Sequence, residues 1–233
     1  MPTVLRRVQA CCGAALFFCL LALAFSAGAA SKSEPEIRIE GATLYVRDAG
    51  AAQATRQVTL PGRITAAALS GPGPTPVIAV ATAAPNALQV FNAQLQPLQN
   101  LRLVDRTSRV ESPVCAIHVA ASRQSFVLVF SSMPEMWELS YNPTAPEMGL
   151  GMVHDFQYRE GHFVPGYLNP QRSSLPFVAA YSALGTTGHT VALRPHANAQ
   201  TMWIHLDVRK PVADSGELAG DWRSCPASEA LPK

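Results

Sequence analysis

The feature that most constrains the fold is a recurrence of short β-type runs. Runs rich in β-branched and aromatic residues begin at Thr43, Val77, Phe126, Phe163 and Thr201, at steps of 34, 49, 37 and 38 residues. Most have a second short run beside them, and turn clusters such as GPGPTP, AASRQS and HANAQ separate them. Apolar residues spaced three and four apart are scarce after residue 30. The pattern therefore predicts an all-β domain.

The spacing also bears on which all-β architecture forms. Units of about 40–50 residues with four short strands are typical of β-propeller blades, as in WD40- or YVTN-like repeats. The chain then forms about four to five blades, incomplete relative to an eight-bladed ring. An irregular β-sandwich is the alternative, because it also has short strands and frequent turns. The stretch VFSSMPEMWELSYNP, Val129 to Pro143, is predicted to supply inner and middle strands of one blade, with Trp137 packed between blades.

The first 30 residues predict a secretory signal peptide, and hence a periplasmic or secreted protein. Arg6 and Arg7 precede an apolar run from Ala10 to Phe25, and Ala27-Gly28-Ala29 has the small residues of a cleavage site. The run is shorter than the about 20 residues of a membrane span, although an uncleaved N-terminal anchor is the alternative. A propeller-like domain is predicted over 31–212, and a loose C-terminal tail over 213–233.

Removal of residues 1–30 leaves a nearly neutral chain. Lys plus Arg falls from 18 to 16, against 16 Asp plus Glu. This balance argues against nucleic acid or an anionic membrane as a partner. Two of the five cysteines remain, Cys115 and Cys225. In an oxidising compartment they allow one disulfide, and two separate buried thiols are the equal alternative.

Four segments in order resemble a known family. They are VIAVATAAPNALQVFNAQLQPLQNL, VCAIHVAASRQSFVLVFSSMPEMWELSYNP, MVHDFQYREGHFVPGYLN and ALGTTGHTVALRPHANAQTMWIHLDVRKP. Together they resemble the haem d1 propeller of cytochrome cd1 nitrite reductase and of related periplasmic haem d1 biosynthesis proteins. The matching region extends roughly from Thr43 to Pro211, and the order of the segments carries the resemblance more than any one motif.

The resemblance implies a propeller that holds haem d1 in a central pocket, with histidines around the haem. His154 stands at the family's His-Asp position, which is a distal pocket histidine. His196 stands near the family's His-Pro position, although the order here is Pro195-His196. These two residues are the candidate cofactor-binding residues. The implied function is an exported accessory that binds or helps to mature a haem d1-type tetrapyrrole in denitrification.

The chain also departs from that family. The family chain is about twice as long, and the blades that carry its proximal iron-ligating histidine have no counterpart here. No Cys-x-x-Cys-His occurs, so no c-type haem attachment is expected. Four to five blades do not close readily into a ring. The chain is therefore expected to complete a ring as a homo-oligomer or to cover an open sheet edge.

Other chemistry has weaker support in the sequence. His154 and His162 could approach each other across a turn as a zinc or copper pair, but no short-spaced histidine motif reinforces them. Glu135 and Glu138 are predicted to be solvated charges rather than an acid–base pair. No complete catalytic set can be named, so an independent enzyme ranks last. A cofactor-free degenerate propeller that acts as a periplasmic protein-interaction module is the main alternative function.

Overall fold

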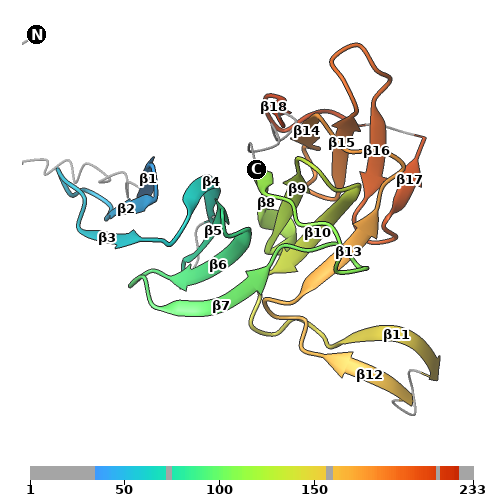
Figure 1. The fold of residues 1–233 in the computed structure, drawn as a ribbon, viewed down its shortest axis with the longest axis horizontal. Helices are drawn as coiled ribbons and strands as arrows, with labels where there is room; N and C mark the ends of the chain where they lie inside the picture. Colours follow the sequence, from blue (N-terminus) through green and yellow to red (C-terminus); the bar gives the residue numbers. More distant parts are fainter. Residues whose placement is uncertain (1–34, 72–74, 156–159, 214–215, 226–233) are drawn as a thin grey trace, which may run out of the picture. The chain divides into compact units, whose positions relative to one another are not determined.

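A computed structural model describes residues 35–71, 75–155, 160–213 and 216–225, with side chains except at 150–155 and 160. The regular elements in these ranges are short antiparallel strands and one 3-10 turn (Figure 1). Within the described ranges, no helix has the length and apolar character needed to cross a membrane. The predicted signal peptide lies outside the described residues.

The chain begins with one three-stranded and one four-stranded sheet. The N-terminal sheet has the order β1-β2-β3, and the first blade has the order β4-β5-β6-β7. The strands are β1 (Glu36–Glu40), β2 (Thr43–Arg47), β3 (Arg56–Thr59), β4 (Arg63–Leu69), β5 (Val77–Ala83), β6 (Ala87–Asn92) and β7 (Pro97–Arg102). In both sheets, strands that are neighbours in sequence pair with each other, which is the meander of a propeller blade.

The second blade has the strand order β8-β9-β10-β13 and contains an insertion. Its strands are β8 (Val114–Ala120), β9 (Ser125–Phe130), β10 (Glu135–Ser140) and β13 (Pro170–Ser174), with the 3-10 turn η1 (Ala121–Arg123) between β8 and β9. Strands β11 (Met148–Asp155) and β12 (Glu160–Val164) form a separate hairpin between β10 and β13. The stretch Val129 to Pro143 therefore contains the end of β9 and the whole of β10, which are the two central strands of this blade. The run at Phe163 was expected to belong to a further blade, but it lies at the end of the hairpin.

The third blade has the order β17-β16-β15-β14, with β18 added at the β14 edge. These strands are β14 (Tyr181–Leu184), β15 (Thr190–Arg194), β16 (Met202–His205), β17 (Lys210–Val212) and β18 (Arg223–Ser224). The prediction of a loose tail over 213–233 is wrong for residues 216–225. These residues follow the edge of β14, and the half-cystine Cys225 forms a disulfide with Cys115 on β8.

The blades pack face to face because their central strands are apolar on both faces. In β9, Phe126, Leu128 and Phe130 lie in the cluster shared with the first blade, whereas Val127 and Val129 lie in the cluster shared with the third blade. All six residues of β9 are buried. A strand alternates its side chains between two faces, so a sheet covered on both sides reads as a continuous apolar run. Successive stacking of this kind is the packing of propeller blades, as predicted.

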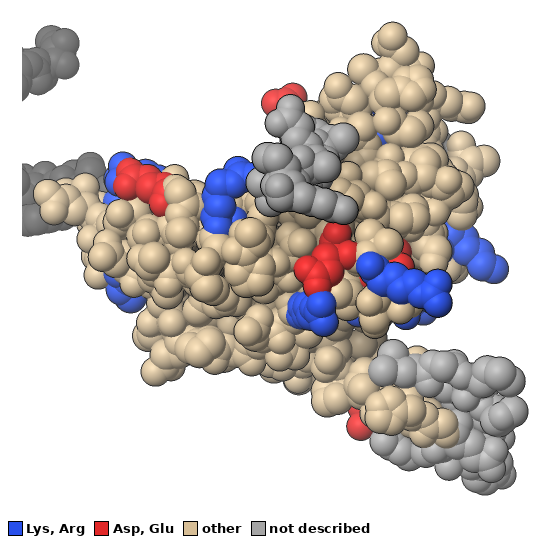
Figure 2. Space-filling model, viewed as in Figure 1, with Lys and Arg blue, Asp and Glu red and all other residues tan. Residues whose placement is uncertain are grey.

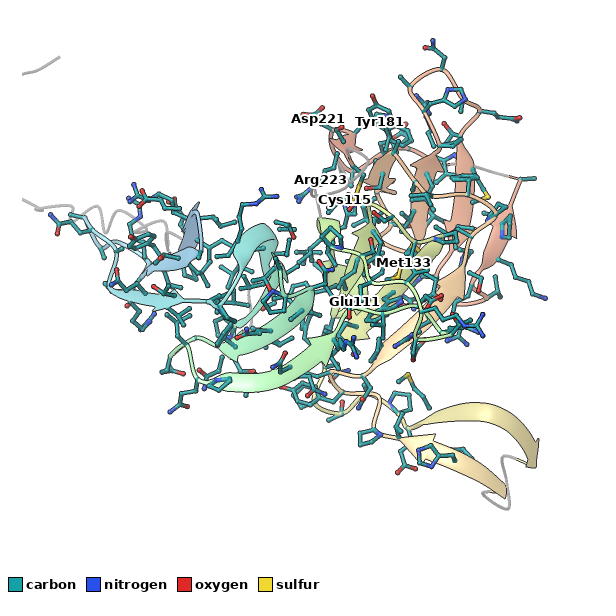
Figure 3. The ribbon with its side chains drawn as sticks, in the orientation of Figure 1. Glu111, Cys115, Met133, Tyr181, Asp221 and Arg223 are labelled. Atoms are coloured by element: carbon teal, nitrogen blue, oxygen red, sulfur yellow. A yellow bond between two sulfur atoms is a disulfide. The ribbon has the colours of Figure 1, made fainter. Side chains whose placement is uncertain are left out.

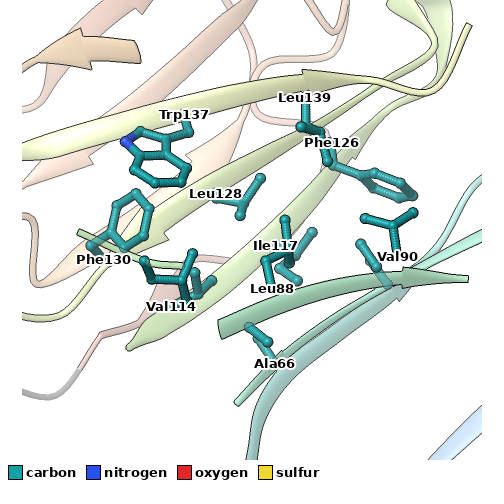
Figure 4. Close-up of a cluster of buried hydrophobic side chains, with 14 of the residues drawn as sticks. Ala66, Leu88, Val90, Val114, Ile117, Phe126, Leu128, Phe130, Trp137 and Leu139 are labelled. Carbon is teal, nitrogen blue, oxygen red and sulfur yellow. The ribbon is translucent and has the colours of Figure 1, made fainter. Parts of the chain in front are cut away.

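Trp137 lies where the sequence places it, in the core between two blades. It is 1% exposed and packs its ring edge against Phe130, with ring centroids 5.0 Å apart. Figure 4 shows it in one cluster with Ile117 of β8 and Leu88 of β6. The burial of this large side chain helps to fix the second blade against the first.

Candidate functional site

A cluster of polar side chains joins the second and third blades at one end of their strands. Here η1 follows β8, β10 ends, and the β14–β15 and β16–β17 turns meet. Strands that alternate in direction bring these turns to the same end of their sheets. We call this set the Arg123 cluster, and its members are Arg123, Ser125, Glu138, His189, His205 and Asp207.

The Arg123 guanidinium is the centre of the cluster. Its Nε donates to Oε1 of Glu138 over 2.8 Å, and its Nη1 donates to Oδ1 of Asp207. The side chains of Arg123 and Glu138 are only 16% and 8% exposed. Ser125 also donates to Oε1 of Glu138, over 2.7 Å. Arg123 and Glu138 belong to the second blade and Asp207 to the third, so the guanidinium connects the two blades.

Two histidines lie beside the same carboxylate. The Nδ1 of His189 is 3.2 Å from Oδ2 of Asp207 and 3.2 Å from Nη1 of Arg123. The Nδ1 of His205 is 3.6 Å from Oδ2 of Asp207 and accepts the backbone N–H of Asp207 over 3.3 Å. Because Arg123 already holds a positive charge against Asp207, a metal cation would meet direct repulsion there.

The pKa values of the charged members follow from these contacts. The hydrogen bond from Arg123 lowers the pKa of Asp207, a smaller opposing effect comes from burial, and His189 lowers it further. Burial acts to lower the pKa of Arg123, but its hydrogen bonds to Glu138 and Asp207 together raise that pKa above its usual value. The ionised forms of Arg123 in the second blade and Asp207 in the third blade are therefore favoured.

A small cavity opens beside this cluster. Its volume is about 210 Å³. It is lined by Arg123, Ser125, Glu138, Ser140, Asn142, Ala145, Pro146 and Gln171. These are mostly hydrogen-bonding groups, and the guanidinium and carboxylate that line it are already paired. Its chemistry suits a small polar molecule. Figure 2 shows charged side chains of both signs in small groups on one face of the molecule, without a large block of either charge.

A second buried polar contact joins the same two blades near their first strands. The Nε2 of His118 on β8 lies 2.9 Å from Oγ of Ser182 on β14. Burial and, to a smaller extent, the nearby positive charge of Arg223 lower the pKa of His118 to about 4. The imidazole is therefore neutral near pH 7. His118 lies within strand β8.

Glu135 and Glu138 are not solvated, contrary to the prediction. They are 6% and 7% exposed. Glu135 accepts Nε1–H of Trp137 over 2.8 Å and the backbone N–H of Arg106 over 3.0 Å. The guanidinium of Arg172 covers the Trp137 ring at 4.1 Å from its centroid. Buried carboxylates need such partners, so both glutamates hold strands and loops together.

The two histidines predicted to bind a cofactor lie in different parts of the fold. His154 is near the end of β11, in the inserted hairpin, and its side chain lies outside the described residues. His196 is exposed in the turn between β15 and β16, at the opposite end of the third blade from the Arg123 cluster. Neither residue belongs to the Arg123 cluster.

The strand pairing of the hairpin bears on the alternative of a metal pair. His162 of β12 pairs with Leu150, and Glu160 pairs with Asp155. The register shifts between these two pairs, and neither of them places His154 opposite His162. Among the side chains that the structure describes, no group of three or more His, Cys, Asp and Glu residues is arranged to hold a metal ion.

Sequence reasoning missed the Arg123 cluster for a simple reason. Arg123 is 84 residues from Asp207 and 66 from His189 in the chain. Only the stacking of two blades brings them together. The available signal was an Arg and an Asp placed in turns at corresponding ends of two repeats, which is too common in exposed turns to identify a site.

Comparison with known proteins supports the fold. No family model and no curated protein matches the sequence. The dihydro-haem d1 dehydrogenase NirN, solved in complex with DHE, matches with a TM-score of 0.59 and 17% identity, over 77% of this chain. The match covers 34% of NirN, so the chain spans about a third of that protein's length.

Two other solved structures have lower scores. Hsv2 from Kluyveromyces lactis has a TM-score of 0.43 at 13% identity, covering 82% of this chain and 48% of its own. Apo AztD from Citrobacter koseri has a TM-score of 0.37 at 10% identity, covering 85% and 48%. Scores at this level support no conclusion about function. Together with the stacked four-stranded sheets, the likeness to NirN shows that this chain has a β-propeller-type fold.

Proposed function

We propose that this protein is an exported propeller-type accessory that binds or helps to mature a haem d1-type tetrapyrrole, and is not an enzyme by itself. The observation that carries the proposal is the likeness of fold to NirN over 77% of the chain. This likeness agrees with the four sequence segments that resemble the haem d1 propeller and occur in the same order. In this proposal His154 and His196 face the tetrapyrrole, where neutral imidazole would ligate iron or donate a proton.

The test is titration of the purified protein with haem d1 and with haem b, followed by absorption spectroscopy. We expect saturable binding that prefers haem d1, weakened at least tenfold by His154→Ala and less by His196→Ala. His162→Ala is the matched control, because His162 is an exposed histidine on the same hairpin. Absence of binding to either haem would reject the proposal, and equal losses in all three variants would reject the assigned residues.

A cofactor-free interaction module is the second candidate function. It is favoured by the β11–β12 hairpin, which interrupts the second blade and forms a separate two-stranded sheet (Figure 1). A hairpin outside the blade offers strand edges and side chains to a protein partner without disturbing the core. Completion of a ring by a second copy is one form of this function.

Deletion of the hairpin separates the two candidates. Residues 148–164 would be replaced by a short Gly-Ser linker between β10 and β13. An interaction module would lose partner or self-association, measured by light scattering across a range of concentrations. A haem accessory that uses His154 would lose haem binding while its association state stayed the same.

A further inference from the structure

Residues 217–225 form a strap along the edge of the third blade. The Thr186 N–H donates to the Glu217 carbonyl over 2.8 Å, and the Ala219 N–H donates to the Leu184 carbonyl over 2.8 Å. Further along, Tyr181 pairs with Ser224 in β18, and the Cys225 N–H donates to the Ala180 carbonyl over 2.7 Å. The strap therefore acts as a fifth, interrupted strand at an edge that would otherwise be open.

The strap also covers the face of the third blade that points away from the second. Trp203 of β16 and two alanines of β14 and β15 form a small buried cluster there. Leu218 and Trp222 of the strap pack against that cluster, and the Arg194 guanidinium lies over the Trp222 ring at 4.3 Å from its centroid. In a complete propeller, this face packs against the next blade. Here the chain's own segment takes that place.

The strap lies next to the buried His118–Ser182 contact. β18 contacts β8 as well as β14, and the charge of Arg223 acts on His118. Figure 3 shows Arg223 beside Tyr181 and Cys115 at the edge of the third blade. Removal of the strap would uncover the first strands of both blades, where His118 and Ser182 are 6% and 0% exposed.

The Cys115–Cys225 disulfide attaches the end of this strap to the second blade. Without it, the attachment rests on a two-residue strand, a few separate hydrogen bonds and two half-buried apolar side chains. Asp221, Arg223 and Ser224 are exposed and add little apolar burial. Segments with few buried contacts open at low free energy, so the covalent bond decides whether the strap stays closed.

We propose that the strap is a cover released by reduction of the Cys115–Cys225 disulfide. A dithiol reductant supplies the electrons. Its thiolate attacks the half-buried Cys115 sulfur, displaces Cys225 as a thiolate and forms a mixed disulfide. The second reductant thiol then resolves the mixed disulfide, which leaves two protein thiols and one oxidised reductant. Release opens the β14 edge, uncovers His118 and exposes the outer face of the third blade. In the oxidised protein, a second copy cannot use that face.

The experiment compares the oxidised full-length protein with the same protein in dithiothreitol, with alkylation of Cys115 and Cys225 followed by peptide mass spectrometry. Hydrogen exchange is read over 180–186 and 217–225, with 77–92 of the first blade as internal reference. We expect at least tenfold faster exchange in the first two regions and no change in the third. We also expect diethyl pyrocarbonate to modify His118 only after reduction, while exposed His162 reacts equally in both states.

Two variants extend the test. The Cys115→Ser/Cys225→Ser variant should show fast strap exchange without reductant and no response to it. In Trp222→Ala with the disulfide intact, His118 should stay protected from diethyl pyrocarbonate. The proposal is wrong if both thiols are alkylated while the strap remains protected. It is also wrong if hydrogen exchange in the first blade becomes faster at the same time, because the disulfide then stabilises the whole domain and not the strap alone. If the double variant does not fold, the comparison of oxidised and reduced wild-type protein still tests the proposal.

Discussion

Arg123 and Glu138 form a buried ion pair at the junction of two blades. The two donor–acceptor distances between them are 2.8 and 3.3 Å, and Ser125 adds a third hydrogen bond to the same carboxylate. A buried carboxylate is tolerated only when it is paired and hydrogen-bonded. The pair therefore makes the end of the second blade depend on Arg123.

Replacement of Arg123 should be strongly destabilising. We expect Arg123→Met to lower the free energy of unfolding by about 3–5 kcal/mol, because Glu138 stays buried without its cation. The double variant with Glu138→Gln should recover part of that loss. Urea denaturation measures both. Arg102→Met is the control, since its pair with Glu111 is exposed and screened by solvent, and its replacement should lower the free energy of unfolding far less. Equal losses at Arg102 and Arg123 would contradict this account.

The buried His118 should make the fold sensitive to mild acid. Its folded pKa is about 4 and lies below the ordinary histidine value of 6.5, so the unfolded chain binds the proton first as the pH falls. Stability is therefore full above pH 6.5 and falls towards pH 4. When the pH is lowered from 7 to 5, the titration of His118 should lower the free energy of unfolding by about 2 kcal/mol. The check is urea denaturation at the two pH values for wild type, His118→Gln and the exposed control His162→Gln. The difference in unfolding free energy between pH 7 and pH 5 should become smaller only in His118→Gln.

Trp137 has a polar role as well as a packing role. Trp137→Phe keeps most of the ring volume but removes the N–H donor to Glu135. We expect a loss of about 1–3 kcal/mol in unfolding free energy, the cost of a buried acceptor left with fewer partners. Trp222→Phe, at a half-buried site, serves as the control and should change stability by less than half as much. A fully neutral Trp137→Phe would show that Glu135 does not need this donor.

Gly62 should resist even the smallest side chain. A Cβ at this position would lie 2.5 Å from the backbone oxygen of Ala83, whereas none of the described neighbours lies within 4 Å of a Cβ at Gly220. Backbone cannot move aside like a flexible side chain, so Gly62→Ala should cost about 1–3 kcal/mol. Gly220→Ala should stay within about 0.5 kcal/mol. Thermal unfolding of the two variants side by side measures the difference.

The positions of most strands follow from local sequence patterns. β-branched and aromatic runs with turn clusters between them fixed β5, β9 and β16, because local chemistry sets where an extended chain forms and ends. The spacing of these runs in units of about 40–50 residues indicated propeller blades. Trp137 could be assigned to the core for this reason. The run at Phe163 was misread because a hairpin strand outside a blade has the same local pattern as one within a blade.

Contacts between residues far apart in the chain depend on how the folded sheets stack. Glu138 was predicted to be solvated, yet Arg123 and Ser125 bind its carboxylate and it is 7% exposed, and nothing within its own strand encodes these partners. The segment before Cys225 looks loose because it is polar and short, but a disulfide over 110 residues and the open edge of β14 hold it in place. Burial and pairing at blade junctions arise from stacking of whole sheets, and a local sequence pattern cannot specify the partner on the next sheet.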